Sequence, residues 1–338
     1  MSIPLQIRQR MSSVLPADAA PVSSFAGFWR RVAAFLVDGV ILGLVGYALG
    51  LLFFDMFVRL GPWGRCVGFV VALAWFVPQE SGRGGGQSPG KRLLGIRVVD
   101  ARGRPLSPAR SVVRFAVFGV PYFLNGAVLP MDVATFAGGV PLALLALGGM
   151  LALAYLLVFN RRTRQSLHDL AVGAFVVRVA GGARHAPGPA RMWRGHRVIA
   201  GALIVLAGAT PLMFPQLMRI PLFADLRVLF LRLAAQPELR SVNVFESVGR
   251  VYGTDFVGVR HELLIQATIA APLADYVPLS TRLAGIALQV YPGAAHEDRI
   301  VVRLARGYDI GIASSWNYNE LALRPEQWAD RVAAGVGN

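Results

Sequence analysis

The first long apolar run of the chain, Val32 to Phe54, contains one ionisable residue, Asp38. At about 1.5 Å per helical residue, this run of 23 residues is long enough to cross a hydrocarbon core of roughly 30 Å. A carboxylate inside the membrane costs about 2 to 3 kcal/mol on insertion scales, so it is normally paired, protonated or used in transport. The run therefore predicts a transmembrane helix with a buried acid. It leaves open whether Asp38 fixes helix packing or lies in an ion or proton path.

Composition and charge also indicate an integral membrane protein. Hydrophobic residues make up 55% of the 338 residues and the mean hydropathy is +0.52, which is too apolar for an ordinary soluble protein. Residues 1–219 carry 23 Lys and Arg against 7 Asp and Glu, whereas residues 220–338 carry 11 against 12. The positive charge lies between the apolar runs, as in loops that face the anionic head groups of a lipid bilayer. We therefore expect a lipid partner and no nucleic acid.

Five apolar runs are candidate spans, and the second of them is short enough to be a re-entrant segment: Val32 to Phe54, Pro62 to Pro78, Phe115 to Met131, Phe136 to Phe159 and Val198 to Met218. We predict an α-helical multi-span membrane protein with four or five transmembrane helices and a C-terminal soluble α+β domain. The predicted segments are a flexible tail (1–24), a membrane domain (25–180), a basic linker (181–197), an additional transmembrane helix (198–218) and the α+β domain (219–338).

The basic residues predict an orientation. They gather before the third span, in residues 83–114, and before the fifth, in residues 161–197. Because cytoplasmic loops carry an excess of Lys and Arg, both loops and the N-terminus are predicted to be cytoplasmic. The last span then leads outward, and the C-terminal domain is predicted to be extracytoplasmic.

The last 119 residues have shorter apolar runs and the alternation of a soluble domain. The predicted order is helix, two strands, helix, two strands, helix: Leu222 to Ala235, Val242 to Val248, Gly258 to Ile269, Thr281 to Val290, Arg299 to Leu304, Asp309 to Ser314, and Pro325 to Ala334. The last two strands are expected to form a hairpin that turns at Arg306 and Gly307. Trp316, Tyr318 and Trp328 can bind a carbohydrate or peptide, or close a small core.

Three blocks of sequence resemble the RDD family of bacterial membrane proteins. They are Phe25 to Asp38 (FAGFWRRVAAFLVD), Gly86 to Asp100 (GQSPGKRLLGIRVVD) followed by Gly103 to Ser107, and Asn160 to Leu170 (NRRTRQSLHDL). Together they cover about residues 25–179. The resemblance implies a multi-span domain of the bacterial inner membrane, with transport or cation/proton exchange proposed for some members. It implies nothing about the fifth span or the C-terminal domain.

Two polar groups are candidates for an ion or proton path. The first is Asp38, which lies seven residues after Arg31, too far along the helix to pair with it, so that Arg114 is the first candidate partner. The second is the pair His168 and Asp169, where the acid can orient the imidazole or raise its pKa in a pH-responsive gate. The alternative for this pair is a helix cap or a salt bridge to the nearby arginines.

The loop from Gly85 to Arg92 has the glycine and lysine spacing of a phosphate-binding loop, but Arg92 replaces the Ser or Thr that would hold magnesium. We expect instead a turn that lays Lys91 and Arg92 on lipid phosphates. After it, Ser107 and Pro108 form a helix-start signal.

Gly39, Gly43, Gly46 and Gly50 form a stripe of small residues that allows another helix to approach, in this chain or in a second copy of it.

Two functions remain open: a transporter or ion exchanger that uses Asp38, or a membrane anchor, scaffold or assembly factor whose C-terminal domain binds a partner. No convincing catalytic set, cofactor motif or metal-ligand spacing is present, and Cys66 is the only cysteine, so we expect neither an enzyme nor a metal site.

Overall fold

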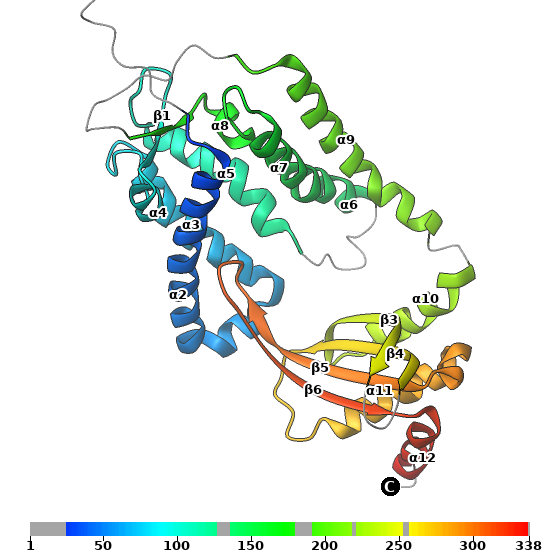
Figure 1. Ribbon diagram of the computed structural model, residues 1–338. Helices are drawn as coiled ribbons and strands as arrows, with labels where there is room; N and C mark the ends of the chain where they lie inside the picture. Colours follow the sequence, from blue (N-terminus) through cyan, green and yellow to red (C-terminus); the bar gives the residue numbers. More distant parts are fainter. Residues whose placement is uncertain (1–24, 127–135, 180–190, 218–220, 253–256, 337–338) are drawn as a thin grey trace, which may run out of the picture. The chain divides into compact units, whose positions relative to one another are not determined.

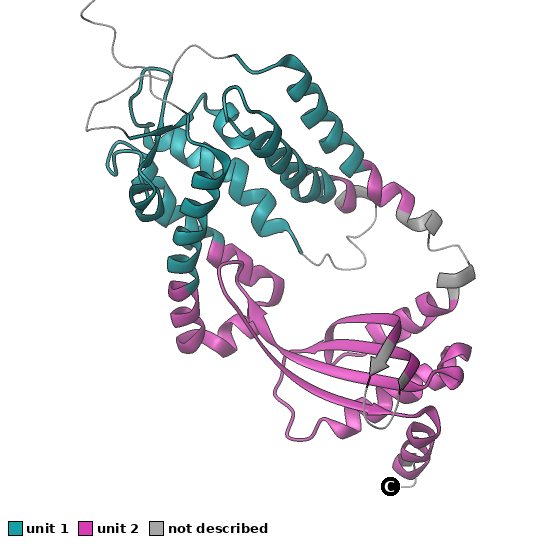
Figure 2. Ribbon diagram, viewed as in Figure 1, with its two compact units in different colours: residues 1–43, 69–127, 141–208 teal, residues 44–68, 128–140, 209–338 magenta. Residues whose placement is uncertain are grey.

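The computed structural model describes residues 25–126, 136–179, 191–217, 221–252 and 257–336 (Figure 1). The predicted tail and most of the predicted linker lie outside these residues. The chain divides into two compact units (Figure 2). Unit 1 comprises residues 1–43, 69–127 and 141–208, and unit 2 comprises residues 44–68, 128–140 and 209–338. The units cross the predicted domain boundaries because residues 44–68 pack with the C-terminal sheet.

The first apolar run is the centre of a longer helix. Helix α2 (Phe28–Leu60) has non-helical backbone angles at Phe53, and the short 3-10 turn η1 (Gly61–Trp63) connects it to α3 (Gly64–Glu80). Gly61 has φ of 56°, a left-handed conformation that suits glycine and ends α2. The second apolar run therefore forms a helix of its own.

Among the described residues, three helical stretches are long and apolar enough to span a membrane: Phe28–Glu80, Gly139–Phe159 and Arg194–Met213. This supports a membrane protein, and the first of the three stretches contains both α2 and α3. The third predicted span begins as α5 (Pro108–Leu124), with Ser107 accepting a hydrogen bond from the Arg110 backbone N–H, so the helix-start signal is confirmed. This helix has 17 residues and includes Arg110 and Arg114.

Unit 1 also contains the basic loops, which fold against the start of α2. Strands β1 (Ile96–Val99) and β2 (Phe175–Arg178) pair antiparallel, and Phe25 adds an isolated bridge to Val177. A small core joins the start of α2 to both loops and consists of Ala26, Ala34, Ile96, Val98, Leu106, Ala174 and Val176. The remaining elements of the unit include the short helices α4 (Pro89–Leu93) and α8 (Leu167–Ala171) and the longer α7 (Gly149–Phe159). They also include the first part of α9 (Arg194–Leu217).

Before α7, the chain forms α6 (Phe136–Ala143) and the π-helical turn η2 (Leu144–Gly148). Gly148 lies close to α9, since a Cβ atom there would lie 2.8 Å from the Ile204 Cα. Gly149 is equally close to α5, since its Cβ would lie 2.6 Å from the Pro121 Cγ. Small residues at the start of α7 thus allow two helices to approach it, as is usual between membrane helices.

Unit 2 contains the predicted sheet, and the predicted element order is confirmed. The helices are α10 (Pro221–Ala234), α11 (Val277–Val290) and α12 (Pro325–Val336); the strands are β3 (Leu239–Tyr252), β4 (Val257–Ile269), β5 (Arg299–Asp309) and β6 (Ser314–Leu323). Strands lie in the order β3-β4-β5-β6, with only the central β4–β5 pair parallel. One core joins the sheet to all three helices. Trp328 is fully buried there and donates a hydrogen bond to the Ile300 carbonyl at 2.9 Å, so it is a core residue.

The predicted hairpin turn at Arg306 and Gly307 is wrong. Strand β5 continues to Asp309, and the chain turns over residues 310–313, where Gly311 has φ of 79°. Gly307 lies opposite Trp316 in the β5–β6 pair, and a Cβ there would overlap the Ser315 carbonyl oxygen. Glycine at this position therefore allows close strand packing, which the sequence pattern does not distinguish from a turn.

The end of this hairpin packs against residues 44–68 within unit 2. Phe57, Tyr308 and Ile310 form its buried centre. Gly46 faces Ala313, whose Cβ would lie 2.8 Å from an added Cβ, and a Cβ at Gly50 would overlap the Tyr308 side chain. At least half of the glycine stripe therefore accommodates a β-hairpin of the same chain, whereas nothing lies within 4 Å of a Cβ at Gly39. Contact through this stripe between copies of the chain stays a prediction.

Replacing Gly50 with alanine should destabilise the packing of the hairpin on α2. The new methyl group forces the buried Tyr308 ring to move, and overpacking of this kind costs about 1 to 3 kcal/mol. Gly39→Ala, on the same helix with open space around it, should be neutral or slightly stabilising. Thermal unfolding of the purified variants in detergent tests this difference. Equal midpoints for the two variants would contradict the packing described here.

Candidate functional site

Arg114 on α5 bridges two buried carboxylates in unit 1. Its guanidinium donates to Glu80 at the end of α3, and through Nη2 and Nε it donates to Asp169 Oδ1 at 2.7 Å and 3.0 Å. Side-chain exposure is 7% for Arg114, 5% for Glu80 and 0% for Asp169. One guanidinium, with its fixed fork of donors, thus ties three elements together.

Two further cations extend this bridge. The Lys91 ammonium lies 2.7 Å from Glu80 Oε1, and Arg31 Nη2 lies 2.5 Å from Asp169 Oδ2. Lys91 Nζ also lies 3.3 Å from Ser88 Oγ, and Ser88 in turn donates to Asp38. The result is a continuous polar chain, defined here as Asp38, Ser88, Lys91, Glu80, Arg114, Asp169 and Arg31, and all of its members are largely buried.

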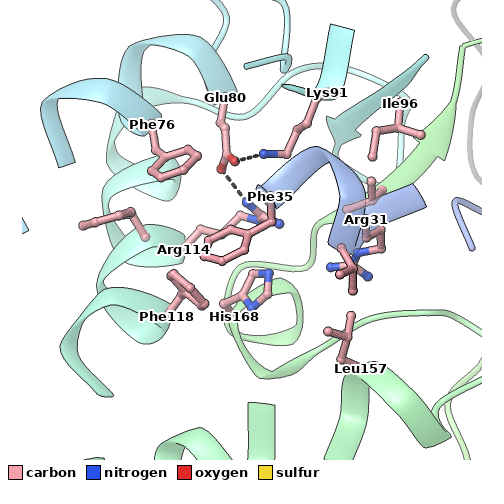
Figure 3. A pocket seen from close by; sticks show the side chains of 13 residues that line it. Arg31, Phe35, Phe76, Glu80, Lys91, Ile96, Arg114, Phe118, Leu157 and His168 are labelled. Carbon is pink, nitrogen blue, oxygen red and sulfur yellow. Dashed lines mark hydrogen bonds and ion pairs between the residues drawn. The ribbon is translucent and has the colours of Figure 1, made fainter. Parts of the chain in front are cut away.

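The polar chain borders a cavity of about 240 Å³ within unit 1 (Figure 3). Its polar lining consists of Arg31, Glu80, Lys91, Arg114 and His168, and four phenylalanines supply much of the apolar lining: Phe35, Phe76, Phe115 and Phe118. The Lys91 ammonium lies 5.3 Å from the centre of the Phe76 ring, a cation–π distance. The site therefore combines charged groups with a rigid aromatic wall.

Asp38 is held by the loop that follows α3. Its two carboxylate oxygens accept hydrogen bonds from the Ser88 hydroxyl and from the Gly90 backbone N–H, the latter at 2.9 Å. A Cβ at Gly90 would overlap the Ala34 carbonyl oxygen, so only glycine allows this loop to reach α2. Asp38 is fully buried and both oxygens are satisfied, which favours the packing interpretation of this residue.

His168 contacts Asp169 through Nε2 at 3.3 Å. Burial is the largest influence on its pKa and lowers it to about 3; Asp169 opposes this shift, while Arg114 and Arg31 add to it. The imidazole is therefore neutral near pH 7. Because Nε2 faces the carboxylate, we assign the proton to Nε2, which leaves Nδ1 as an acceptor, and this buried atom has no partner in the described part of the chain.

Asp169 is a helix cap as well as an ion-pair partner. It accepts a hydrogen bond from the Ser166 backbone N–H at 3.1 Å, at the start of α8. Its cationic partners are Arg31 and Arg114, and not the nearby arginines of the Asn160 to Leu170 block, which the sequence offered as an alternative. Burial tends to raise its pKa, but the charges of Arg31, His168 and Arg114 and the Arg114 hydrogen bond together lower it far below its usual range.

The structure brings together four of the five predicted path residues, Arg31, Arg114, His168 and Asp169. Asp38 is connected to them through Ser88 and the predicted lipid-contact residue Lys91. The predicted pairing of Arg114 with Asp38 is wrong, because Arg114 binds Glu80 and Asp169. The sequence interpretation missed Glu80, although a carboxylate directly after the Pro62 to Pro78 run is a recognisable signal. Lys91 is turned inward onto Glu80, while Arg92 donates to the Gly84 carbonyl at 3.5 Å. Lipid contact by these two residues stays a prediction.

Residues 25–173 match the model of the RDD family. We call residues 25–173 the RDD segment. The match ends just before β2, so the RDD segment includes α2, α3, α5 and α8 and with them every member of the polar chain. No match to the chain was found among curated proteins or among solved structures.

Removing the Asp38 carboxylate should weaken the packing of the RDD segment. Asp38→Ala leaves the Gly90 N–H and the Ser88 hydroxyl without their acceptor, which costs about 1 to 3 kcal/mol for each buried group. Gly90→Ala should be at least as harmful because of its overlap with Ala34. Gly201→Ala, where nothing lies within 4 Å, is the control. Thermal unfolding in detergent measures these effects. A midpoint for Asp38→Ala equal to that of the wild type would contradict this account.

Acidification should destabilise the protein through His168. Below its ordinary pKa of 6.5, the unfolded chain binds a proton at this position that the folded chain does not bind until about pH 3. The free energy of unfolding should therefore fall by about 1.4 kcal/mol per pH unit below 6.5 on account of this group. Asp169 adds a loss only below its ordinary value of 3.8. His168→Gln should flatten the dependence between pH 6 and pH 4, which chemical unfolding at a series of pH values measures; an unchanged slope would contradict it.

Proposed function

We propose that the RDD segment is a membrane transport domain whose binding site is the cavity beside Arg114. One observation carries this proposal: a cavity within the helical unit is lined by five ionisable side chains. Charged groups in membrane domains are costly, and they typically mark pathways for ions, protons or substrates. The proposal moves the working residues from Asp38 to Glu80, Arg114 and Lys91.

The polar chain favours a mechanism in which its carboxylates exchange ion-pair partners over one in which protons are conducted along the chain. Arginine keeps its proton in proteins, so Arg114 interrupts any continuous proton relay between Glu80 and Asp169. Glu80 differs from Arg114 because it can bind a proton when its two cationic partners, Lys91 and Arg114, separate from it. If the helices move apart, Glu80 becomes able to bind a proton or a cation. This is the step through which a proton-coupled exchange would operate.

We also propose a bacterial inner-membrane location with the basic loops and the N-terminus in the cytoplasm. The packing of unit 1 supports a common side for the start of α2 and both basic loops, because they share one small core. Residues 44–68 pack instead with the C-terminal sheet. This is in keeping with an extracytoplasmic C-terminal domain.

Transport is tested by flux in proteoliposomes that carry a pH or sodium gradient. Glu80→Gln should reduce flux to the level of empty liposomes, because the amide can neither release nor bind the proton. Asp38→Asn, reconstituted in equal amount, should retain flux while lowering thermal stability. Loss of flux in Asp38→Asn with flux retained in Glu80→Gln would return the path to Asp38. Absence of flux in the folded wild type would contradict transport.

A second candidate function is an anchor that presents the C-terminal domain to a partner. The sheet favours it, because its three helices share the core on one face while Phe245, Trp316 and Tyr318 are 51%, 37% and 54% exposed. Exposed aromatic residues are typical of binding surfaces. If the protein is such an anchor, substitutions at Trp316 and Tyr318 should weaken binding of the partner, and Glu80→Gln should affect only stability.

A further inference from the structure

The cavity beside Arg114 has the chemistry of a site for a small amphipathic anion. We propose that it binds a molecule with one carboxylate or phosphate, a short apolar body and a hydroxyl group. This inference rests on the proposed transport function and names its substrate class. Each of the three parts follows from a different feature of the lining (Figure 3).

The charge of the lining favours an anion. Three of the four charged side chains that line the cavity are cations, Arg31, Lys91 and Arg114, against one carboxylate, Glu80; Asp169 and Asp38, behind this lining, balance the charge of the polar chain as a whole. A metal cation in the cavity would lie beside three cationic side chains and one carboxylate, at a distance where repulsion is poorly screened. An anion would lie beside the same three cations. This argues that the ligand itself is anionic, whichever ion is coupled to its movement.

The walls favour an apolar body of limited size. Phe35 and Phe118 meet edge to face with ring centres 5.4 Å apart, and Phe76 and Phe115 are stacked at 5.9 Å. Such rings present flat apolar surface and favour an aromatic or short aliphatic group. The cavity of about 240 Å³ lies below the range of roughly 300 to 1,000 Å³ that is typical of pockets for drug-sized ligands, so the part of the ligand that it holds is small.

The third requirement comes from His168. This side chain lines the cavity, and its buried Nδ1 has no hydrogen-bond partner among the described residues. With the proton on Nε2 toward Asp169, Nδ1 accepts a hydrogen bond and requires a donor. A ligand hydroxyl supplies that donor, whereas a second anionic group would be repelled. The same chemistry occurs in a soluble hydroxy acid and in the glycerol phosphate head group of an anionic lipid.

Calorimetric titration of the full-length protein in detergent tests the proposal, with 4-hydroxybenzoate as the anionic probe. Benzoate lacks the hydroxyl, and benzylamine replaces the anion by a cation. We expect 4-hydroxybenzoate to bind more tightly than benzoate, and benzylamine not to bind. Because no gradient is present, binding without flux would refute the proposed transport alone, and flux without binding would refute this substrate class alone.

Variants locate the binding in this cavity. Lys91→Met should weaken affinity about tenfold or more, as expected for loss of one charged hydrogen-bond partner. Arg83→Met removes an exposed cation outside the cavity lining and should bind as the wild type does. His168→Phe should remove the preference for 4-hydroxybenzoate over benzoate, and this ratio remains informative if Lys91→Met fails to fold. Equal loss in Lys91→Met and Arg83→Met, or tight binding of benzylamine, would overturn the proposal.

The source of the ligand is distinguished by repeating the titration in nanodiscs. If phosphatidylglycerol nanodiscs suppress binding of 4-hydroxybenzoate relative to phosphatidylcholine nanodiscs, the occupant is an anionic lipid head group. If binding is the same in both, the occupant is a soluble anion. Two negative results together overturn the proposal. The first is that 4-hydroxybenzoate does not bind in detergent or in either nanodisc. The second is that phosphatidylglycerol does not raise the thermal unfolding midpoint of the detergent-solubilised wild type.

Discussion

The bridge that Arg114 makes between Glu80 and Asp169 is the interaction on which the architecture of the RDD segment depends. Each carboxylate is buried, and each would be costly without its cationic partners. Through Arg31 the bridge includes the start of α2, and through Lys91 it includes the loop after α3. Four elements that are distant in sequence are thus placed around one guanidinium, and the cavity lies where their apolar side chains do not fill the space beside it.

Asp38 has a different part in the same arrangement. It binds the loop at Ser88 and Gly90, and this brings Lys91 to Glu80. The buried acid therefore positions a residue of the cavity without lining the cavity itself. This explains why the strongest single feature of the sequence and the proposed binding site are neighbours but not the same residues.

The sequence predicted what depends on local pattern. The long apolar helix, the start of α5 at Ser107 and the order of strands and helices after residue 220 all follow from periodicity and capping residues. The partners of the charged residues could not be predicted in this way. Arg114 lies 34 residues from Glu80, and Arg31 lies 138 residues from Asp169, so their pairing is decided by tertiary packing. The positions of Gly307 and Gly50 were ambiguous for the same reason, because a glycine permits close approach without indicating what approaches.

The most direct test of this account is the unfolding free energy of Arg114→Met compared with Arg110→Met in detergent. Arg110 lies one helical turn earlier on α5 and, within the described part of the chain, its side chain donates to the Val172 carbonyl alone, so its loss should cost about 1 kcal/mol. Loss of Arg114 removes a shared partner from two buried carboxylates and should cost about 3 to 5 kcal/mol. Equal and small costs for the two variants would contradict the central role of this bridge.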